Sequence, residues 1–134
     1  MILARLARSW RIKMDSRLAR LGLTQAKWVT LYHLALNDEP VLQRDLADQV
    51  GVEGPTMVRL LDGLARMGLI VREPAPHDRR GKVICLTERA KPVVEDMLAV
   101  AERLREEIFA DLSKAELATC VSALRRVQRN LDAA

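Results

Sequence analysis

The sequence predicts a mainly α-helical fold that carries one small β-hairpin. Apolar residues recur every three or four positions along most of the 134 residues, which is the spacing of one helix face. Glycines and capping residues divide this pattern into separate helices. Residues 69–73 and 83–86 are instead short and rich in β-branched side chains, so we expect these two segments to be strands.

The stretch from residue 43 to residue 86 is predicted to contain two helices in tight succession and then the hairpin. Apolar residues recur at four-residue spacing from Gln43 to Val50. Gly51 can adopt the positive φ that ends a helix, and Pro55 suits the first turn of the next one. Gly68 ends this second helix. Its predicted buried residues are Met57, Leu60, Leu61 and Leu64. This order of elements is typical of a winged helix-turn-helix.

A polar loop from Pro74 to Lys82 is expected to join the two strands. It carries the cations Arg79, Arg80 and Lys82 against the single carboxylate of Asp78. Such a cationic tip can reach DNA phosphates or a minor groove. The alternative is an ordinary charged turn.

The second helix of this stretch has an outer face opposite its buried residues. At about 100° per residue, this face contains Pro55, Arg59, Asp62 and Arg66, with Thr56 and Val58 beside it. An Arg in the outward first turns of a helix can bind guanine in a major groove through two hydrogen bonds. A solvated helix face would show the same charges. We favour nucleic acid because the arginines of helix and loop follow one helix-turn-helix pattern.

Further helices are expected on both sides of the winged segment. The first covers residues 2–21, and the second covers 25–37 with Thr24 as its N-cap. A long helix follows Thr87, and Ser113 with Glu116 forms a capping box for the last one.

The apolar faces of the first, fifth and sixth helices need a partner, because the winged segment is already a complete unit. Two long helices at the ends of so short a chain more naturally pair with a second copy. We therefore predict a homodimer. The predicted organisation is a single domain over 1–134, a DNA-binding part over 24–86, and dimerisation helices over 1–21 and 87–134.

Composition favours duplex DNA over other partners. The net charge is +4, and residues 66–82 hold five Lys or Arg against two acids. The four aromatic residues are too few for a platform that stacks single-stranded bases. No apolar run approaches the ~20 residues of a membrane span. Two cysteines, Cys85 and Cys120, suggest buried thiols in a reducing cytoplasm.

No catalytic or metal-binding set emerges from the sequence. His33 and His77 fall on separate elements, and no Cys and His spacing matches a zinc site. There is also no Gly-rich phosphate loop and no nucleophile elbow. We expect a protein that is not an enzyme and that needs no metal or other cofactor.

Several segments together resemble the MarR family of winged helix-turn-helix transcription regulators, and within it the SlyA-like branch. They are Leu23–Leu31, Gly51–Asp62, Asp78–Lys82 and the pair Leu86-Thr87. The resemblance implies a dimeric regulator whose terminal helices form the interface. It implies that Arg80 enters the minor groove, while Asp78 and Arg79 shape the wing. The full set that we expect to hold DNA is Pro55, Thr56, Val58, Arg59, Asp62, Asp78, Arg79, Arg80 and Lys82.

A small aromatic carboxylate is expected as an effector. Trp28 and Tyr32 are four residues apart and share a helix face, while Arg8 and Arg11 lie three apart on the first helix. If the two faces meet, they form an apolar slot with cationic ends. The family resemblance points the same way. The alternative is that Trp28 and Tyr32 belong to the core and that both arginines are solvated.

The predicted function is therefore sequence-specific binding of double-stranded DNA by a homodimer on a palindromic operator, with release by the effector. The alternative from another class is a winged-helix module that binds protein, with its basic wing merely solvated. Salt-dependent binding of duplex DNA distinguishes the two.

Overall fold

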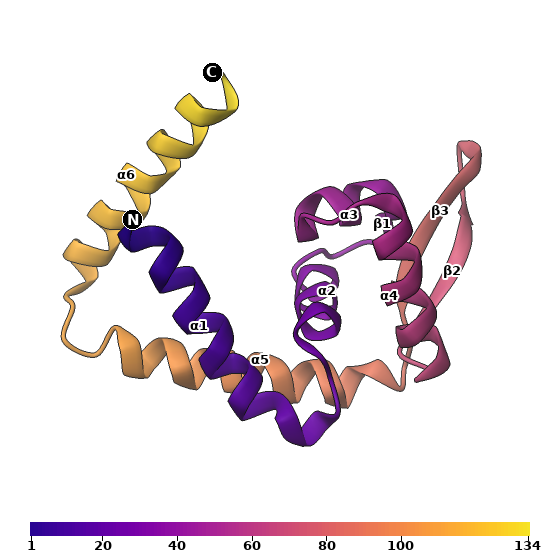
Figure 1. Ribbon diagram of the computed structural model, residues 1–134, viewed down its shortest axis with the longest axis horizontal. Helices are drawn as coiled ribbons and strands as arrows, with labels where there is room; N and C mark the ends of the chain where they lie inside the picture. Colours follow the sequence, from indigo (N-terminus) through magenta and orange to yellow (C-terminus); the bar gives the residue numbers. More distant parts are fainter. The chain divides into compact units, whose positions relative to one another are not determined.

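The computed structural model describes the backbone of residues 1–134 and the side chains of all of them except Arg79. Its elements form a mainly helical fold with a small antiparallel sheet, as predicted (Figure 1). The elements are α1 (Ile2–Leu18), the 3₁₀ turn η1 (Ala19–Leu21), α2 (Gln25–Ala35), β1 (Val41–Leu42), α3 (Gln43–Val50), α4 (Gly54–Arg66), β2 (Ile70–Ala75), β3 (Asp78–Leu86), α5 (Ala90–Ile108) and α6 (Lys114–Asp132).

The chain divides into two compact units, residues 1–102 and residues 103–134. The boundary falls inside α5, so the first unit contains α1 and the first part of α5 together with the winged segment. These bounds differ from those of the predicted functional parts, in which the DNA-binding part spans residues 24–86 and the dimerisation helices lie on both sides of it. The first unit is the one that bears on the candidate DNA-binding face.

The helix-turn-helix forms as the sequence predicts. Gly51 ends α3 with φ of 80°, in the left-handed region where a side chain is disfavoured. Pro55 lies in the first turn of α4. Met57, Leu61 and Leu64 are completely buried on one face of α4. The opposite face of α4 is therefore left free for a partner.

A short strand that the sequence prediction missed completes the sheet. The strand order is β1-β3-β2, with both pairings antiparallel. In β1, Val41 pairs with Ile84 and Leu42 pairs with Val83. Two residues are too few to show an alternating pattern, and only the pairing with β3 reveals them as a strand. Because α3 follows β1 directly, this pairing fixes where α3 begins.

The wing is longer and tighter than predicted. The prediction of a loop over residues 74–82 is wrong, because β2 continues to Ala75 and β3 begins at Asp78, so that only Pro76 and His77 turn. Pro74 pairs with Lys82 and Ala75 pairs with Asp78, which leaves residues 79–81 of β3 as a bulge. Pro and Gly marked these positions as loop in the sequence, although both residues also occur at bulges and on edge strands.

Gly81 lets the bulge close against its own hairpin. A Cβ atom at this position would lie 3.2 Å from the Cβ of Ala75 and 3.2 Å from Oδ2 of Asp78. The backbone N–H of Arg80 donates a hydrogen bond of 3.0 Å to Oδ1 of Asp78. The carboxylate of Asp78 therefore shapes the bulge that presents Arg80.

The core of the first unit joins α1, α2 and α5. Met14, Leu18, Trp28, Leu31 and Met97 are completely buried. Thr24 caps α2 by accepting a hydrogen bond from the N–H of Lys27, as predicted, although α2 ends at Ala35 and not at residue 37. α1 likewise ends at Leu18, and η1 continues it to residue 21. Arg20 in η1 forms a 3.0 Å ion pair with Asp96 in α5.

The second unit consists of the end of α5 and α6. The predicted capping box is present, since Ser113 and Glu116 each accept a hydrogen bond from the other's backbone N–H. α6 has no buried residue. Its apolar stripe faces solvent in a single chain through Val121, Leu124, Val127 and Leu131.

Membrane insertion has no candidate helix here. Across the described residues, every helix is too short or too polar to cross a bilayer.

The hydroxyl of Thr87 links the turn after α4 to the start of α5 through two hydrogen bonds. It donates to the carbonyl of Gly68 at 2.6 Å and accepts from the N–H of Ala90 at 3.3 Å. Thr87→Val leaves the carbonyl of Gly68 without this donor, while the N–H of Ala90 keeps its bond to the backbone carbonyl of Thr87. We therefore expect the variant to lower the free energy of unfolding by about 1–3 kcal/mol. Urea unfolding followed by circular dichroism measures this. Thr87→Ser keeps the hydroxyl and should retain most of the stability, and equal losses in both variants would contradict the hydrogen-bond explanation.

Candidate nucleic-acid interface

The outer face of α4 carries the predicted major-groove residues. Pro55, Val58 and Arg59 are exposed, and Thr56 is partly exposed beside them. Nη2 of Arg59 donates a hydrogen bond of 3.3 Å to the hydroxyl of Thr56 one turn earlier. Because this bond lies on the surface, the guanidinium can exchange it for a base edge at little cost. The first turns of this face thus offer one cation, Arg59, among small and apolar side chains, and the exposed Arg66 follows in the last turn.

Asp62 also lies on this face, but it has a partner within the chain. Its Oδ1 accepts from Nη2 of Arg72 at 2.6 Å, and the same nitrogen donates to the carbonyl of Val58 at 3.3 Å. Arg72 stands on β2, so the contact links the wing to α4. Sequence analysis did not select Arg72 as a site residue. No local signal in the sequence marks Arg72, because it reaches α4 only through the pairing of the sheet.

The wing presents further predicted residues on the same unit. Asp78, Arg80 and Lys82 are all exposed on β3. The side chain of Arg79, which was predicted beside them, lies outside the described residues. Two cations of the wing therefore extend from the bulge that Asp78 and Gly81 shape.

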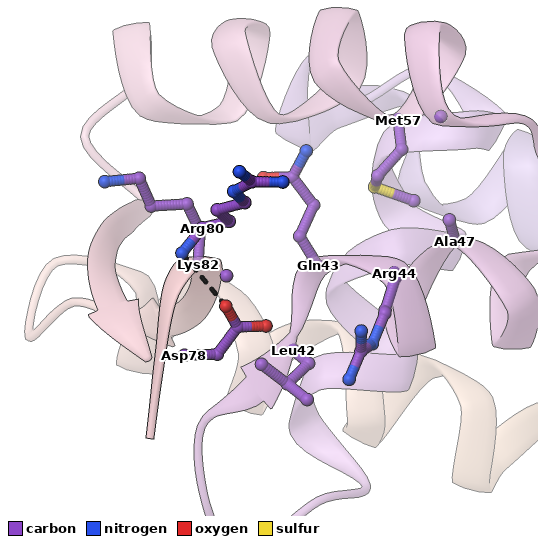
Figure 2. A pocket seen from close by; sticks show the side chains of 10 residues that line it. Leu42, Gln43, Arg44, Ala47, Met57, Asp78, Arg80 and Lys82 are labelled. Atoms are coloured by element: carbon purple, nitrogen blue, oxygen red, sulfur yellow. Dashed lines mark hydrogen bonds between the residues drawn. The ribbon is translucent and has the colours of Figure 1, made fainter. Parts of the chain in front are cut away.

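A groove lies between the wing and the two helices of the helix-turn-helix. It is a cavity of about 450 Å³ that receives residues from the start of α3, the start of α4 and the wing (Figure 2). Its lining residues are Leu42, Gln43, Arg44, Ala47, Gly54, Met57, Asp78, Arg80, Gly81 and Lys82. Gln43 and Arg44 were not predicted as site residues, because only the pairing of β1 with β3 brings the start of α3 to the wing.

The residues predicted to bind the effector are arranged differently from the apolar slot that the sequence predicts. Trp28 is completely buried, and its Nε1 donates a hydrogen bond to Asp15 of α1. The ring of Trp10 lies edge-on at 5.5 Å from that of Trp28 and 6.2 Å from that of Tyr32. The faces of α1 and α2 therefore do meet, but Trp10 fills the space between them. Arg8 and Arg11 are exposed.

His33 and Cys85, which both lie outside this interface, have shifted pKa values. Burial lowers the pKa of His33. Burial and the nearby carboxylate of Glu73 raise the pKa of the Cys85 thiol, which disfavours the reactive thiolate. Cys85 is half-buried and Cys120 is exposed on α6, so the expectation of two buried thiols is wrong. No group of three potential metal ligands occurs among the described residues.

Comparison with known proteins agrees with this geometry. A sequence profile of the MarR family matches residues 21–81. The solved structure of the transcriptional regulator PA3341 is 43% identical and has a TM-score of 0.94, with 99% of this chain and 97% of that chain covered. The chain belongs to the MarR family.

Two other MarR-family structures extend the likeness. A crystal structure of MarR is 27% identical with a TM-score of 0.77, and it covers 99% of this chain and 96% of that one. A complex of S. aureus MepR with DNA is 25% identical with a TM-score of 0.82, and it covers 97% and 95%. The matched proteins are regulators and not enzymes, so this chain is a MarR-family transcriptional regulator with a winged-helix DNA-binding fold.

The link between Asp62 and Arg72 supports a prediction about the wing. Both side chains are partly exposed, at 45% and 29%, so the pair should contribute no more than about 1 kcal/mol to global unfolding. Asp62→Ala should therefore hardly change global stability, but it should speed amide hydrogen exchange in β2 and β3 because the wing loses its tie to α4. Glu88→Ala breaks the exposed pair of Glu88 with Lys91 and serves as the control. Equal exchange in the two variants would refute a local role for the link.

Proposed function

We propose that this MarR-family regulator binds double-stranded DNA sequence-specifically, as a homodimer on a palindromic operator. The observation that carries the proposal is that the exposed face of α4 and the cationic wing belong to one compact unit. A relative that was solved as a complex with DNA, S. aureus MepR, supports the same class of partner. The SlyA-like branch remains our proposal for its place within the family.

In this proposal α4 lies in the major groove and the wing reaches the neighbouring minor groove. Arg59 reads a guanine, and Pro55, Thr56 and Val58 contact bases or sugars beside it. Arg80 and Lys82 supply positive charge to the backbone or the minor groove. Asp62 acts through Arg72 by holding the wing against α4. The helix thus selects the sequence, and the wing adds affinity.

Replacing Arg59 and Arg80 separates these two roles. Arg59→Ala should cost roughly 1–3 kcal/mol on the best site and much less on random duplex. Arg80→Ala should weaken binding to both duplexes and flatten its salt dependence. Fluorescence anisotropy at two salt concentrations measures both variants. Equal losses on both duplexes for Arg59→Ala would make it a phosphate contact, whereas wild-type protein without salt-dependent DNA binding would favour the protein-interaction module.

Dimerisation is proposed through α1, α5 and α6. The exposed apolar side chains Leu3 and Leu6 on α1 and the uncovered stripe on α6 support this, because apolar surface of this extent is costly in water. Such an interface should bury above ~2,000 Å² in total. Its two-fold axis would place two copies of α4 on half-sites about 10 bp apart.

A charge placed within the stripe of α6 tests the dimer. We expect wild-type protein to sediment as a dimer at micromolar concentration. Leu124→Glu should shift it toward the monomer, since a buried carboxylate without a partner is costly at an apolar interface. Thr119→Glu adds the same charge on the opposite side of α6 and should leave the dimer intact. A monomeric wild type, or a dimer that tolerates Leu124→Glu, would count against this interface.

We also propose that a small aromatic carboxylate releases the DNA by binding near Trp10 and Tyr32. Arg8 and Arg11 are exposed on the same helix as Trp10, which supports a cationic end for the site. Because Trp28 is buried in one chain, the ligand ring would contact Trp10 and Tyr32 first. The ligand must bind the DNA-free form more tightly than the bound form.

Tryptophan fluorescence can follow this effector directly, because Trp10 and Trp28 are the only tryptophans of the chain. Salicylate should change the fluorescence and lower DNA affinity at millimolar concentration or below. Arg11→Ala should weaken both effects, and the neutral analogue salicylamide should act more weakly than the acid. If neither fluorescence nor DNA affinity responds to salicylate or benzoate, this site for the effector is wrong.

A further inference from the structure

The groove between the wing and the helix-turn-helix has positive sides and a partly apolar floor. Arg44 comes from α3, and Arg80 and Lys82 come from β3. Leu42, Ala47 and Met57 supply the apolar part of the lining. In Figure 2 the guanidinium of Arg80 extends from the wing toward the side-chain amide of Gln43. Side chains from four elements, β1, α3, α4 and β3, thus converge on one space.

The charge balance of this groove favours an anion. Its lining contains three cations and one carboxylate, that of Asp78. Oδ1 of Asp78 already accepts the backbone N–H of Arg80. Arg44, Arg80 and Lys82 take part in none of the ion pairs that the structure describes, which leave out the side chain of Arg79. Their charges are therefore available to a ligand.

The backbone at the groove is also open to close approach. α3 and α4 both begin at its edge, and neither helix has a side-chain cap on its first N–H groups. Gly54, the first residue of α4, lines the groove, and a Cβ atom built there would meet nothing within 4 Å. Uncapped N–H groups at helix starts add to the attraction of an anion that the cations already draw in.

The geometry of duplex DNA indicates which anion would lie in this groove. One sugar–phosphate strand always separates a major groove from the adjacent minor groove. If α4 occupies the major groove and the wing the minor groove, that strand must cross the space between them, which is where this groove lies. The apolar lining suits the face of a deoxyribose, and the cations suit the phosphate beside it.

We propose that the groove is the seat of one DNA backbone phosphate in each half-site, and that Arg44 and Gln43 of α3 bind this phosphate together with Arg80. This inference rests on the proposed function and adds two residues of α3 to the DNA-binding set. It makes Arg44 a contact that carries no sequence preference, because a phosphate is the same at every base pair.

Arg44→Ala tests the seat against a matched control. The variant should lower affinity about tenfold on the best site and on random duplex alike. It should also make the slope of log K against log salt shallower by about 0.9. Arg5→Ala removes an equally exposed cation of α1, which does not line the groove, and should change neither quantity. Arg44→Lys keeps the charge and should recover part of the affinity.

Neutral phosphates locate the contact on the DNA. A duplex selected from a random pool by the wild-type protein is synthesised with a methylphosphonate at one position at a time. One position per half-site, between the bases contacted by α4 and the minor groove reached by the wing, should weaken wild-type binding strongly and Arg44→Ala much less, because the variant has already lost one of the contacts to that phosphate.

The outcomes separate this inference from the proposed function. If Arg80→Ala weakens binding while Arg44→Ala behaves like Arg5→Ala, the seat is refuted and the proposed function stands. The seat is also refuted if every methylphosphonate weakens Arg44→Ala as much as wild type. Wild-type protein that binds no duplex refutes both.

Discussion

The pairing of β3 with strands on both of its sides is the constraint on which the proposed DNA-binding face of this protein depends. Through β1, it fixes the start of α3. Through β2, it carries Arg72 to the side of α4, where the guanidinium reaches both Asp62 and the carbonyl of Val58. The helix-turn-helix and the wing are therefore held together by one central strand. Without this strand, the residues that line the groove would not be held in fixed positions relative to one another.

Local rules predicted the helices well, because each helix carries its own start and stop residues. Gly51, Pro55 and the capping box of Ser113 and Glu116 act over four residues or fewer, and all of them form as predicted. The strands are a different case. β1 is defined only by a partner more than forty residues later in the sequence, and the bulge at residues 79–81 depends on register, so neither could be predicted from a local pattern.

The candidate site shows the same division. Arg59 and Arg80 could be predicted as site residues, because helix periodicity places Arg59 on the outer face of its helix and the composition of the hairpin indicates a cationic tip at Arg80. Arg44 and Arg72 could not, since the first reaches the groove through β1 and the second reaches α4 through the sheet. The helix face that carries Trp28 could be predicted. Its complete burial and its ring contact with Trp10 could not, because that contact joins two helices and neither helix alone indicates it.

The strand order of the sheet has a consequence for how the protein associates with other chains. Both outer strands are edges, and an open edge is a template onto which another chain can add a strand. β1 pairs only with Val83 and Ile84, so β3 is also an edge toward the tip of the wing, where the bulge at residues 79–81 interrupts its row of N–H and C=O groups. On the other side, β2 has Pro74 near its end, where no N–H is available for a new partner. Both interruptions limit edge-to-edge pairing between wings, so the hairpin can stay exposed without adding strands from other chains.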